Sequence, residues 1–424
     1  MSTDADALVI GAGPAGASTA ILLANSGWRV ILVEQHVFPR QKVCGECLTA
    51  GCLALLDELG VGRAVIDRAG PELRQVGWMS RSPTIIADLP SCLDGPYRYG
   101  RALGRDQLDA LLLKRARELG VTIVQPAKVR TVSGGPGGFE CVIDASDGGH
   151  AYALEQVGTS LAVRVAVVVD AHGSWEAGPD QGKAGAVVQA RAPRRSRSDL
   201  FGFKASFCHA TLPRGLLPVL AFRGGYGGIV VAEGGRLTLA GCIRRDTLRA
   251  WRARMPGVSA GLAMEEYLRY SCPEVGEVLA RAQRIGPWLS IGPVRPGIRV
   301  SNAEGPFRVG NAAGETHPLI GEGMSMALQS AFLLTSRLIE QPALAIDSRR
   351  SREIDRGYDQ AWRNAFAPRL RFAAIYAHIA MHPALGVWAG AFLRRWPQLL
   401  TEGARLAGKA RRTVGAKSLC EAAP

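Results

Sequence analysis

The sequence predicts an α/β (α+β) fold, in which a parallel sheet carries two glycine-rich turns and a separate antiparallel sheet faces them. One turn is Gly11–Gly16, and the other is Gly310–Gly323, some 300 residues later. Between them, Phe201–Arg244 alternates apolar and polar residues around a turn at Glu233-Gly234-Gly235, which is typical of antiparallel strands. With 424 residues, 47% of them hydrophobic, the chain can bury a large core over two domains and a tail.

The N-terminal turn lies between a strand and a helix. The apolar run Ala7–Ile10 precedes Gly11–Gly16, and a helical stretch, Ala17–Ser26, follows it. A second apolar run, Val30–Val33, ends in Glu34, 23 residues after the first glycine. This order of strand, tight turn, helix, strand and acid predicts a Rossmann-like dinucleotide site.

Each residue type in this turn has a physical role. Gly11 permits the turn, Gly13 lets the backbone meet a pyrophosphate, and Gly16 lets the helix pack on the strand. The helix N-terminus around Ala15 supplies partial positive charge, and Glu34 is placed to bind ribose hydroxyls.

The second turn reads GNAAGETHPLIGEG over Gly310–Gly323. It follows a strand-like run, Pro306–Val309, and precedes a helix-like run, Met324–Ala331. Small residues let the backbone approach a bulky ligand, and such a turn aims its N–H groups at that ligand. A nicotinamide enzyme needs only the first site, so the second one indicates an extended dinucleotide such as FAD.

The remaining elements follow from local pattern. We expect helices at Leu53–Leu59, at Leu108–Leu119, in parts of Leu248–Gln283, and from Phe332 to about Gly408. We expect strands at Val121–Val124, Phe139–Asp144 and Leu161–Asp170, the last two in a β-meander. The uncharged run Phe372–Leu393 is interrupted by His, Pro and Gly residues, which favours a helix–turn–helix over a membrane span.

These elements predict a discontinuous cofactor domain with an interleaved substrate domain. We expect the cofactor domain over residues 1–75, 100–178 and 290–335, and the antiparallel-sheet substrate domain over residues 76–99 and 179–289. A basic helical C-terminal segment follows over residues 336–424.

Three motifs in this order resemble the FAD-dependent superfamily of hydroxybenzoate-hydroxylase-type monooxygenases, geranylgeranyl reductases and flavin-dependent halogenases. The first is Gly11–Gly16 with Glu34. The second is Arg105-Asp-Gln-Leu-Asp109, which is similar to the family's Arg-x-x-Leu/Phe-Asp helix start. The third is Gly310–Gly323, similar to Gly-Asp-Ala-Ala followed by Pro-x-x-Gly-x-Gly. The resemblance covers about residues 6–335.

The resemblance implies FAD contacts, carried over residue by residue. They are Gly11, Gly13, Ala15, Gly16, Glu34, Arg105, Gly310, Asn311, Pro318, Gly321, Gly323 and Met324. Two positions depart from the family pattern: Asn311 stands where Asp is usual, and His172 stands where an acid is common. Both changes alter the expected affinity for FAD without removing the site.

Candidate catalytic residues lie in two loops. The loop Phe38–Leu48 is similar to the reductase and halogenase branch, which places Glu46 and Cys47 near the flavin ring by analogy. Cys44 and Cys47 have the spacing of a redox pair, but a small-residue loop packed on the flavin is the favoured interpretation. His317 precedes Pro318, so it either approaches the ring edge or bonds to backbone.

The choice among reactions rests on what the sequence lacks. The Trp-x-Trp-x-Ile-Pro segment of halogenases does not occur, and no lysine lies between Lys42 and Lys114, so halogenation is disfavoured. The first hypothesis is a monooxygenase that hydroxylates an aromatic or polyketide-like substrate in a biosynthetic pathway through a flavin hydroperoxide. The alternatives are a geranylgeranyl-reductase-like alkene reductase of an isoprenoid or lipid, and a non-catalytic FAD-binding electron-transfer partner.

Reducing equivalents need an external source. No second GxGxxG lies in a strand–turn–helix context, so we expect NAD(P)H to dock transiently or a reductase partner to deliver electrons. The substrate is expected to be a small molecule, with a large or carrier-bound substrate left open. No metal-ligand pattern stands out.

Charge and cysteine usage indicate location and partners. From Gln360 onward, ten Lys or Arg face two Glu, which gives this segment +8 of the formal net charge of +14. Such a basic helical tail suits an anionic partner or a membrane surface better than a nucleic acid. With no signal peptide before Leu8 and nine scattered cysteines, we expect a cytoplasmic protein, peripheral to the inner face of the membrane.

Overall fold

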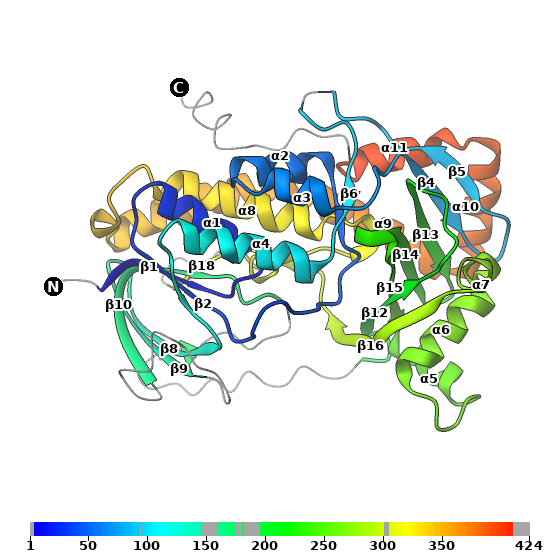
Figure 1. Cartoon of the computed structure of the whole chain (residues 1–424), viewed down its shortest axis with the longest axis horizontal. Helices are drawn as coiled ribbons and strands as arrows, with labels where there is room; N and C mark the ends of the chain where they lie inside the picture. The colour runs from blue at the N-terminus through cyan, green and yellow to red at the C-terminus, as the bar shows by residue number, and fades with distance from the viewer. Residues whose placement is uncertain are drawn as a thin grey trace.

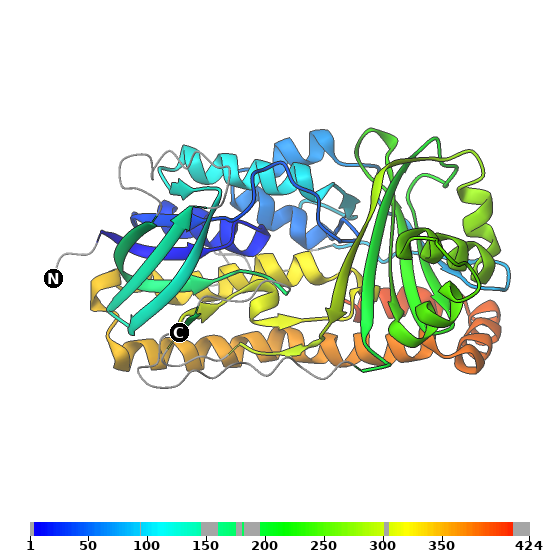
Figure 2. The same ribbon diagram turned by 90° about the horizontal axis from the view of Figure 1, so that it is seen from below.

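The computed structural model describes residues 4–93, 95–145, 160–174, 180–181, 196–300 and 305–409. The molecule is elongated, with one sheet at each end of its long axis (Figures 1 and 2). A single helix, α9 (Ser348–Met381), runs along the length of both parts (Figure 2). This mixed α/β architecture is the predicted fold class.

The first sheet has the order β11-β8-β9-β10-β1-β2-β7, and β18 pairs with β10. Strands β1, β2, β7, β10 and β18 run parallel, whereas β8, β9 and β10 form an antiparallel meander. The strands are β1 (Ala5–Ile10), β2 (Val30–Val33), β7 (Thr122–Val124), β8 (Ala127–Gly135), β9 (Gly138–Ala145), β10 (Ser160–Asp170), β11 (Asp180–Gln181) and β18 (Phe307–Arg308). The carboxyl ends of β1, β2, β10 and β18 therefore meet at one edge of the sheet.

Helices cover this sheet on the side from which both glycine-rich turns emerge. Helix α1 packs between α4 and α8, and α9 lies against α8. The helices are α1 (Pro14–Asn25), α2 (Ala50–Glu58), α3 (Gly62–Arg68), α4 (Arg105–Glu118) and α8 (Gly323–Leu338). The predicted helices near Leu53 and Leu108, and the strands of the meander, are confirmed within a few residues at their ends.

The second sheet has the order β16-β12-β15-β14-β13-β4-β5. Its pairings are antiparallel apart from β13 with β4, so the antiparallel layer predicted for Phe201–Arg244 is confirmed. The strands are β4 (Gln75–Met79), β5 (Ile85–Asp88), β12 (Leu200–Cys208), β13 (Leu216–Phe222), β14 (Gly225–Val231), β15 (Leu237–Arg244) and β16 (Gln283–Val294). Helices α5 (Arg245–Arg252), α6 (Ala260–Ser271) and α7 (Pro273–Val278) lie beside this sheet (Figure 1).

Short elements connect the two parts. They are β3 (Cys47–Leu48), β6 (Arg101–Ala102), β17 (Gly297–Ile298) and β19 (Gly314–Glu315), with the 3₁₀ turns η1 (Glu233–Gly235), η2 (Gly310–Ala312), η3 (Pro318–Ile320) and η4 (Ala343–Ala345). Strand β3 pairs with β6, and β17 pairs with β19. The predicted limits of the two domains stay predictions.

The C-terminal helices are α9, α10 (Pro383–Arg395) and α11 (Gln398–Leu406). Helix α9 starts at a cap in which Asp347 accepts a hydrogen bond of 2.8 Å from the Arg350 N–H, and it ends just before Pro383 starts α10. This break confirms the helix–turn–helix expected within Phe372–Leu393. In the part of the chain that the structure describes, no single helix is long and apolar enough to cross a membrane; α9 and α10 pass that test only as a pair bent by 104°.

Two hydrophobic clusters lie in the part that contains the first sheet, one lies in the part that contains the second sheet, and a further cluster joins the two parts. This joining cluster connects Cys47 of the cofactor side to Tyr226 and Cys242 of the second sheet and to Ala377 and Leu393 of the C-terminal helices. Packing in this cluster therefore holds the loop at Cys47, the second sheet and the C-terminal helices together.

Candidate active site

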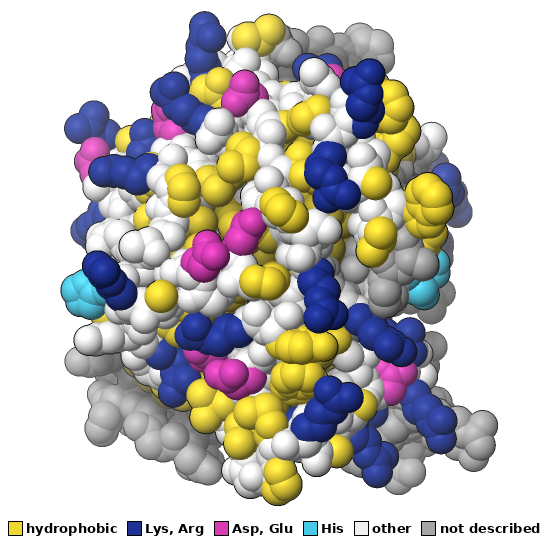
Figure 3. Space-filling view, turned by 90° about the vertical axis from the view of Figure 1, so that its right-hand side faces the viewer, with side chains coloured by type: hydrophobic (Ala, Val, Ile, Leu, Met, Phe, Trp, Pro, Cys, Tyr) yellow, Lys and Arg dark blue, Asp and Glu magenta, His cyan; other side chains and the backbone are white. Residues whose placement is uncertain are grey.

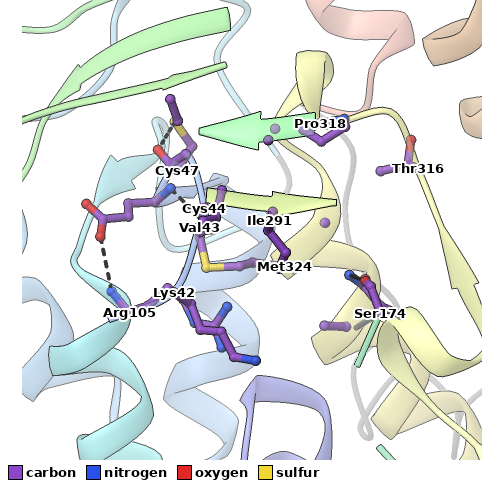
Figure 4. Close-up of a pocket in the computed structure, with 18 of the residues that line it drawn as sticks. Lys42, Val43, Cys44, Cys47, Arg105, Ser174, Ile291, Thr316, Pro318 and Met324 are labelled. Atoms are coloured by element: carbon purple, nitrogen blue, oxygen red, sulfur yellow. Dashed lines mark hydrogen bonds between the residues drawn. The ribbon is translucent and has the colours of Figure 1, made fainter. Parts of the chain in front are cut away.

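One cavity of about 270 Å³ runs between the two sheets. Its walls come from both glycine-rich turns, from the Lys42–Cys47 loop and from the inner face of the second sheet. Figure 4 shows this convergence, with Cys44, Cys47 and Arg105 on one side and Thr316, Pro318 and Ser174 on the other. A cavity of this size is of the order expected for a ligand site.

The first turn is built for close backbone approach. Gly11 has a φ of +97°, and a Cβ on Gly16 would lie 1.9 Å from the Gly11 carbonyl oxygen, so both positions require glycine. Gly13 and Ala15 line the cavity at the N-terminus of α1, and no side chain caps that helix. A Cβ on Gly13 would meet only the Arg105 side chain, at 3.6 Å, so the space beside Gly13 is left for a ligand.

Glu34 closes the same end of the cavity. Its buried carboxylate accepts a hydrogen bond of 2.8 Å from the Ala12 N–H and pairs with Arg40 at 3.1 Å. The Nε of Arg40 is buried without a hydrogen-bond partner, although Arg40 lines the cavity. A guanidinium at the wall of a cavity favours an occupant with acceptor oxygens.

The second turn lies directly opposite the first. Gly310 has a φ of +62°, and a Cβ there would lie 2.8 Å from the Ala15 Cβ, so the two motifs touch. Asn311 Nδ2 donates to Ser174 Oγ at 2.7 Å, and both residues line the cavity. The other predicted contacts in this turn also line it: Pro318, Gly321, Gly323 and Met324.

Two predicted contacts have different surroundings. Arg105 lines the cavity, but its guanidinium forms two hydrogen bonds of 2.8 Å to the buried Asp109 carboxylate. Burial opposes the charge, yet the Asp109 carboxylate holds the pKa of Arg105 above its usual range. Gly16 packs against Gly11 and Ala171 behind the turn, so it shapes the site without lining it.

Glu46 lies at the centre of a buried charged cluster. It has a φ of +59° and receives hydrogen bonds from Lys204, from Arg236 Nη2 at 3.0 Å and from Thr238 Oγ1 at 2.6 Å. Burial acts to raise the pKa of Glu46, but the Lys204 and Arg236 charges bring it below its usual value. An ionised carboxylate with these partners has no proton to donate. Its contacts therefore indicate a structural role, in which Glu46 links the Phe38–Leu48 loop to the second sheet.

The two loop cysteines are free thiols. Cys47 Sγ donates to the Gly45 carbonyl at 3.5 Å, while Cys44 Sγ accepts from the Glu46 N–H at 3.3 Å. Burial raises the pKa of Cys47 to about 11, so the thiol keeps its proton. The arrangement matches the favoured interpretation of a packed small-residue loop.

His317 lies behind the wall of the cavity. Its Nδ1 is 2.9 Å from the Tyr226 hydroxyl oxygen, and it is Tyr226 that lines the cavity. Burial lowers the pKa of His317 and raises that of Tyr226 well above its usual value, so both groups are neutral at pH 7. No local pattern in the sequence indicates this pairing, because its partners lie 91 residues apart.

The second sheet gives the cavity an uncharged wall. Among the described lining residues, those that β12–β16 contribute carry no charge. They are Gly202, Phe203, Leu217, Pro218, Val219, Tyr226, Gly227, Gly228, Ile229, Val230, Ala240, Gly241, Cys242, Ile291 and Val294. This wall suits an apolar substrate.

A cation from the C-terminal segment also reaches the site. Lys409 lines the cavity, and its Nζ lies 3.9 Å from the Glu322 carboxylate, which Arg369 also approaches at 3.5 Å. Burial raises the pKa of Glu322 despite these two cations. Sequence analysis counted Lys409 only as part of the basic tail; Arg411, Arg412, Lys417 and Glu421 of that tail lie outside the described residues.

The residues present fit FAD. Two glycine-rich turns face one cavity, Gly13 leaves open space beside a helix N-terminus, and the cationic Arg40 lines the cavity. The Gly11–Gly16 turn with Glu34 and Arg40 would hold the dinucleotide end. Asn311 and the Pro318–Met324 segment would hold the ring end, next to the second sheet.

Comparison with known proteins leads to the same group. Residues 4–156 match the FAD binding domain family. The menaquinone reductase of Mycobacterium tuberculosis is 36% identical over 137 residues, which are 31% of this chain and 32% of that protein, so the match spans about a third of the relative. The menaquinone reductase of Mycolicibacterium smegmatis is 28% identical over 399 residues, covering 91% of this chain and 90% of the relative.

Other relatives carry out different reactions on a similar fold. The 6-methylpretetramide 4-monooxygenase of Streptomyces rimosus is 27% identical over 329 residues, covering 77% of this chain and 73% of that protein. The flavin-dependent halogenase CmlS superposes with a TM-score of 0.69 at 19% identity, over 91% of this chain and 67% of that one. The N-terminal match shows an FAD binding domain, and the shared fold is consistent with the FAD-dependent superfamily of hydroxybenzoate-hydroxylase-type monooxygenases, geranylgeranyl reductases and flavin-dependent halogenases.

Proposed function

We propose that this flavoenzyme reduces a carbon–carbon double bond in an apolar, isoprenoid-like substrate. One observation carries the proposal: the substrate wall of the cavity is uncharged, and its polar group at the cofactor end is a neutral tyrosine paired with a neutral histidine. Reduction of an isolated alkene needs an apolar binding wall and a proton donor at the second carbon.

In this reaction, apolar side chains bind the substrate and Tyr226 supplies the proton. Bound FAD in its reduced form supplies an electron pair with one hydrogen. Phe203, Leu217 and Ile229 hold the apolar substrate and exclude water from it. The Tyr226 hydroxyl donates the second hydrogen as a proton. His317, in the tautomer we assign with the proton on Nδ1, donates to the Tyr226 oxygen and stabilises the charge left on it.

Similarity over most of the chain supports this reaction. The menaquinone reductase of Mycolicibacterium smegmatis aligns over nine-tenths of both chains. The sequence motifs alone favoured oxygen insertion, whereas the uncharged wall of the cavity favours reduction. Electrons would arrive from NAD(P)H that docks transiently or from a reductase partner, as the absence of a second fingerprint suggests.

Anaerobic turnover tests the proposal. The FAD-loaded chain is reduced with dithionite and mixed under argon with a polyprenyl quinone whose ring is already in the quinol form, and the polyprenyl chain of the product is analysed by mass spectrometry. We expect a product that carries two added hydrogens. A substrate that stays unchanged without oxygen, and that gains labelled oxygen once ¹⁸O₂ is admitted, would contradict reduction.

Hydroxylation of a phenolic substrate is the second candidate. The observation that favours it is the 2.9 Å contact between His317 Nδ1 and the Tyr226 hydroxyl, because a neutral imidazole there can accept a phenol proton through that hydroxyl. The 6-methylpretetramide 4-monooxygenase of Streptomyces rimosus supports this alternative. A non-catalytic electron-transfer role is less favoured because it gives no use to the apolar wall.

A further inference from the structure

We propose that α10 and the start of α11 dock on an anionic lipid bilayer. Six residues define what we call the α10 patch: Val387, Trp388, Phe392, Arg394, Arg395 and Trp396. This inference concerns a surface outside the cavity, so it stands or falls independently of the reaction.

Helix α10 is apolar on both of its faces. Its inner face packs on the protein through Gly390 and the buried Leu393. The outer face presents Trp388, which is 75% exposed, and Val387, which is 68% exposed. A surface helix normally turns a polar face to solvent, so this outer face lacks the partner that its composition requires.

The exposed aromatic residues form one stripe. Trp388, Phe392 and Trp396 follow each other at intervals of four residues, and the rings of Phe392 and Trp396 are 4.4 Å apart. Tryptophan and phenylalanine next to arginine are typical of helices that lie in the headgroup region of a bilayer. Leu399 and Leu406 extend the exposed apolar surface onto α11.

Charge identifies the occupant as an anionic surface. Between Arg371 and Leu406 the chain has four arginines and a single acid, Glu402, which pairs with Arg405 at 2.8 Å. Arg394 and Arg395 are exposed at the end of the aromatic stripe. Figure 3 shows the end of the molecule that carries α10, where hydrophobic side chains are interspersed with Lys and Arg. A second copy of the chain would bring these arginines together, whereas acidic lipid headgroups neutralise them.

The patch also lies one helix layer from the cavity. Ala377, Ala380 and Leu393, on the inner faces of α9 and α10, belong to the same cluster as Tyr226 and Val230, which line the cavity. Strand β13, whose Leu217 lines the cavity, contacts both helices. Docking through α10 would therefore bring the apolar compartment next to the bilayer, where an apolar substrate resides.

Vesicle flotation tests the inference with the FAD-loaded full chain. Phosphatidylcholine vesicles with and without phosphatidylglycerol serve as probes. We expect binding to the anionic vesicles that weakens as salt rises, because exposed charges are screened beyond about 10 Å at 0.1 M. Equal binding to neutral and anionic vesicles, or no binding to either, would overturn the proposal.

Matched variants separate the two parts of the patch. Trp388→Ser/Phe392→Ser should abolish flotation, while Leu344→Ser, at a 65% exposed residue outside the patch, should leave it unchanged. Arg394→Gln/Arg395→Gln should weaken binding to anionic vesicles roughly 30-fold. Its control, Arg352→Gln/Arg356→Gln, removes the same charge near the other end of α9, a helix about 50 Å long.

Two outcomes of this experiment would overturn the proposal. One is equal loss of flotation in the patch variants and their controls, with FAD content and melting temperature unchanged. The other is a chain that sediments as a dimer, becomes a monomer on Trp388→Ser/Phe392→Ser and never floats with vesicles, which would assign the patch to a second copy.

Discussion

The cofactor side and the substrate side of the cavity are built from different kinds of groups. On the cofactor side, the backbone turns at Gly11, Gly13 and Gly310 shape the space, and charged side chains such as Arg40 and Arg105 line it. On the substrate side, neutral side chains of the second sheet, such as Phe203 and Tyr226, form the wall. Backbone geometry recognises one fixed ligand, whereas an apolar wall selects only a class of molecule.

The largest expected effect comes from the open space beside Gly13. Gly13→Val should weaken FAD binding by more than about 100-fold, since the pyrophosphate must approach this backbone. The protein itself leaves room, because the nearest atom to a Cβ there is Arg105 Nη2 at 3.6 Å. Absorbance at 450 nm of the purified protein measures FAD content.

Gly276→Val is the matched control for this change. It adds the same side chain on α7, where a Cβ also meets nothing within 4 Å, and it should keep full FAD. A yellow Gly13→Val protein with stoichiometric FAD would show that the cofactor does not pass this turn.

The Glu46 cluster joins the two sides, and breaking it should destabilise the whole fold. Glu46→Gln leaves Lys204 buried without its carboxylate, which costs about 3 kcal/mol. Urea denaturation measures this loss in the free energy of unfolding. The double variant Glu46→Gln/Lys204→Met should recover part of it; equal stability of the single variant and wild type would refute the cluster's role.

The same cluster predicts a pH dependence. The folded pKa of Glu46 lies below its usual value of 4.5, so its stabilisation is complete above that value. It should disappear as the pH falls through the lowered folded pKa. The difference in stability between wild type and Glu46→Gln should therefore be constant at neutral pH and shrink only in acid, as melting temperatures over a pH series would show.

On the substrate side, Tyr226→Phe should slow turnover roughly 100-fold through loss of the proton donor. KM and the rate of flavin reduction should change little, since the ring remains. Tyr267→Phe is the control, because its hydroxyl donates to the Arg223 carbonyl at 2.8 Å and does not line the cavity. Similar turnover in both variants would remove Tyr226 from the mechanism.

The smallest effect is expected at Cys47. Its pKa of about 11 leaves roughly one thiol in a thousand ionised at pH 8, so alkylation by iodoacetamide should be slow. Cys47→Ala should keep turnover within about threefold of wild type, because the proton comes from Tyr226. A 100-fold loss in this variant, with FAD retained, would instead make Cys47 the donor.

The contrast between the two sides explains what the sequence could predict. The positions of Gly11, Gly16 and Gly310 in the two turns could be predicted, because a turn of fixed geometry requires glycine at fixed spacing. The helix–turn–helix at Pro383 was also predicted from local sequence, because His, Pro and Gly residues interrupt the run Phe372–Leu393. The pairs Lys204–Glu46 and Tyr226–His317 were missed because their partners lie 158 and 91 residues apart, and no local pattern encodes such contacts.

The central claim is that reduced FAD and an apolar alkene meet in this one cavity. Anaerobic stopped-flow mixing of the reduced enzyme with a polyprenyl quinone whose ring is already in the quinol form tests it most directly. The account predicts reoxidation of the flavin at 450 nm, with one saturated double bond formed per flavin and two solvent deuteriums incorporated in D₂O, because the hydrogen on reduced flavin and the tyrosine proton both exchange with solvent. A flavin that stays reduced with this substrate until oxygen is admitted, and then yields an oxygenated product, would contradict it.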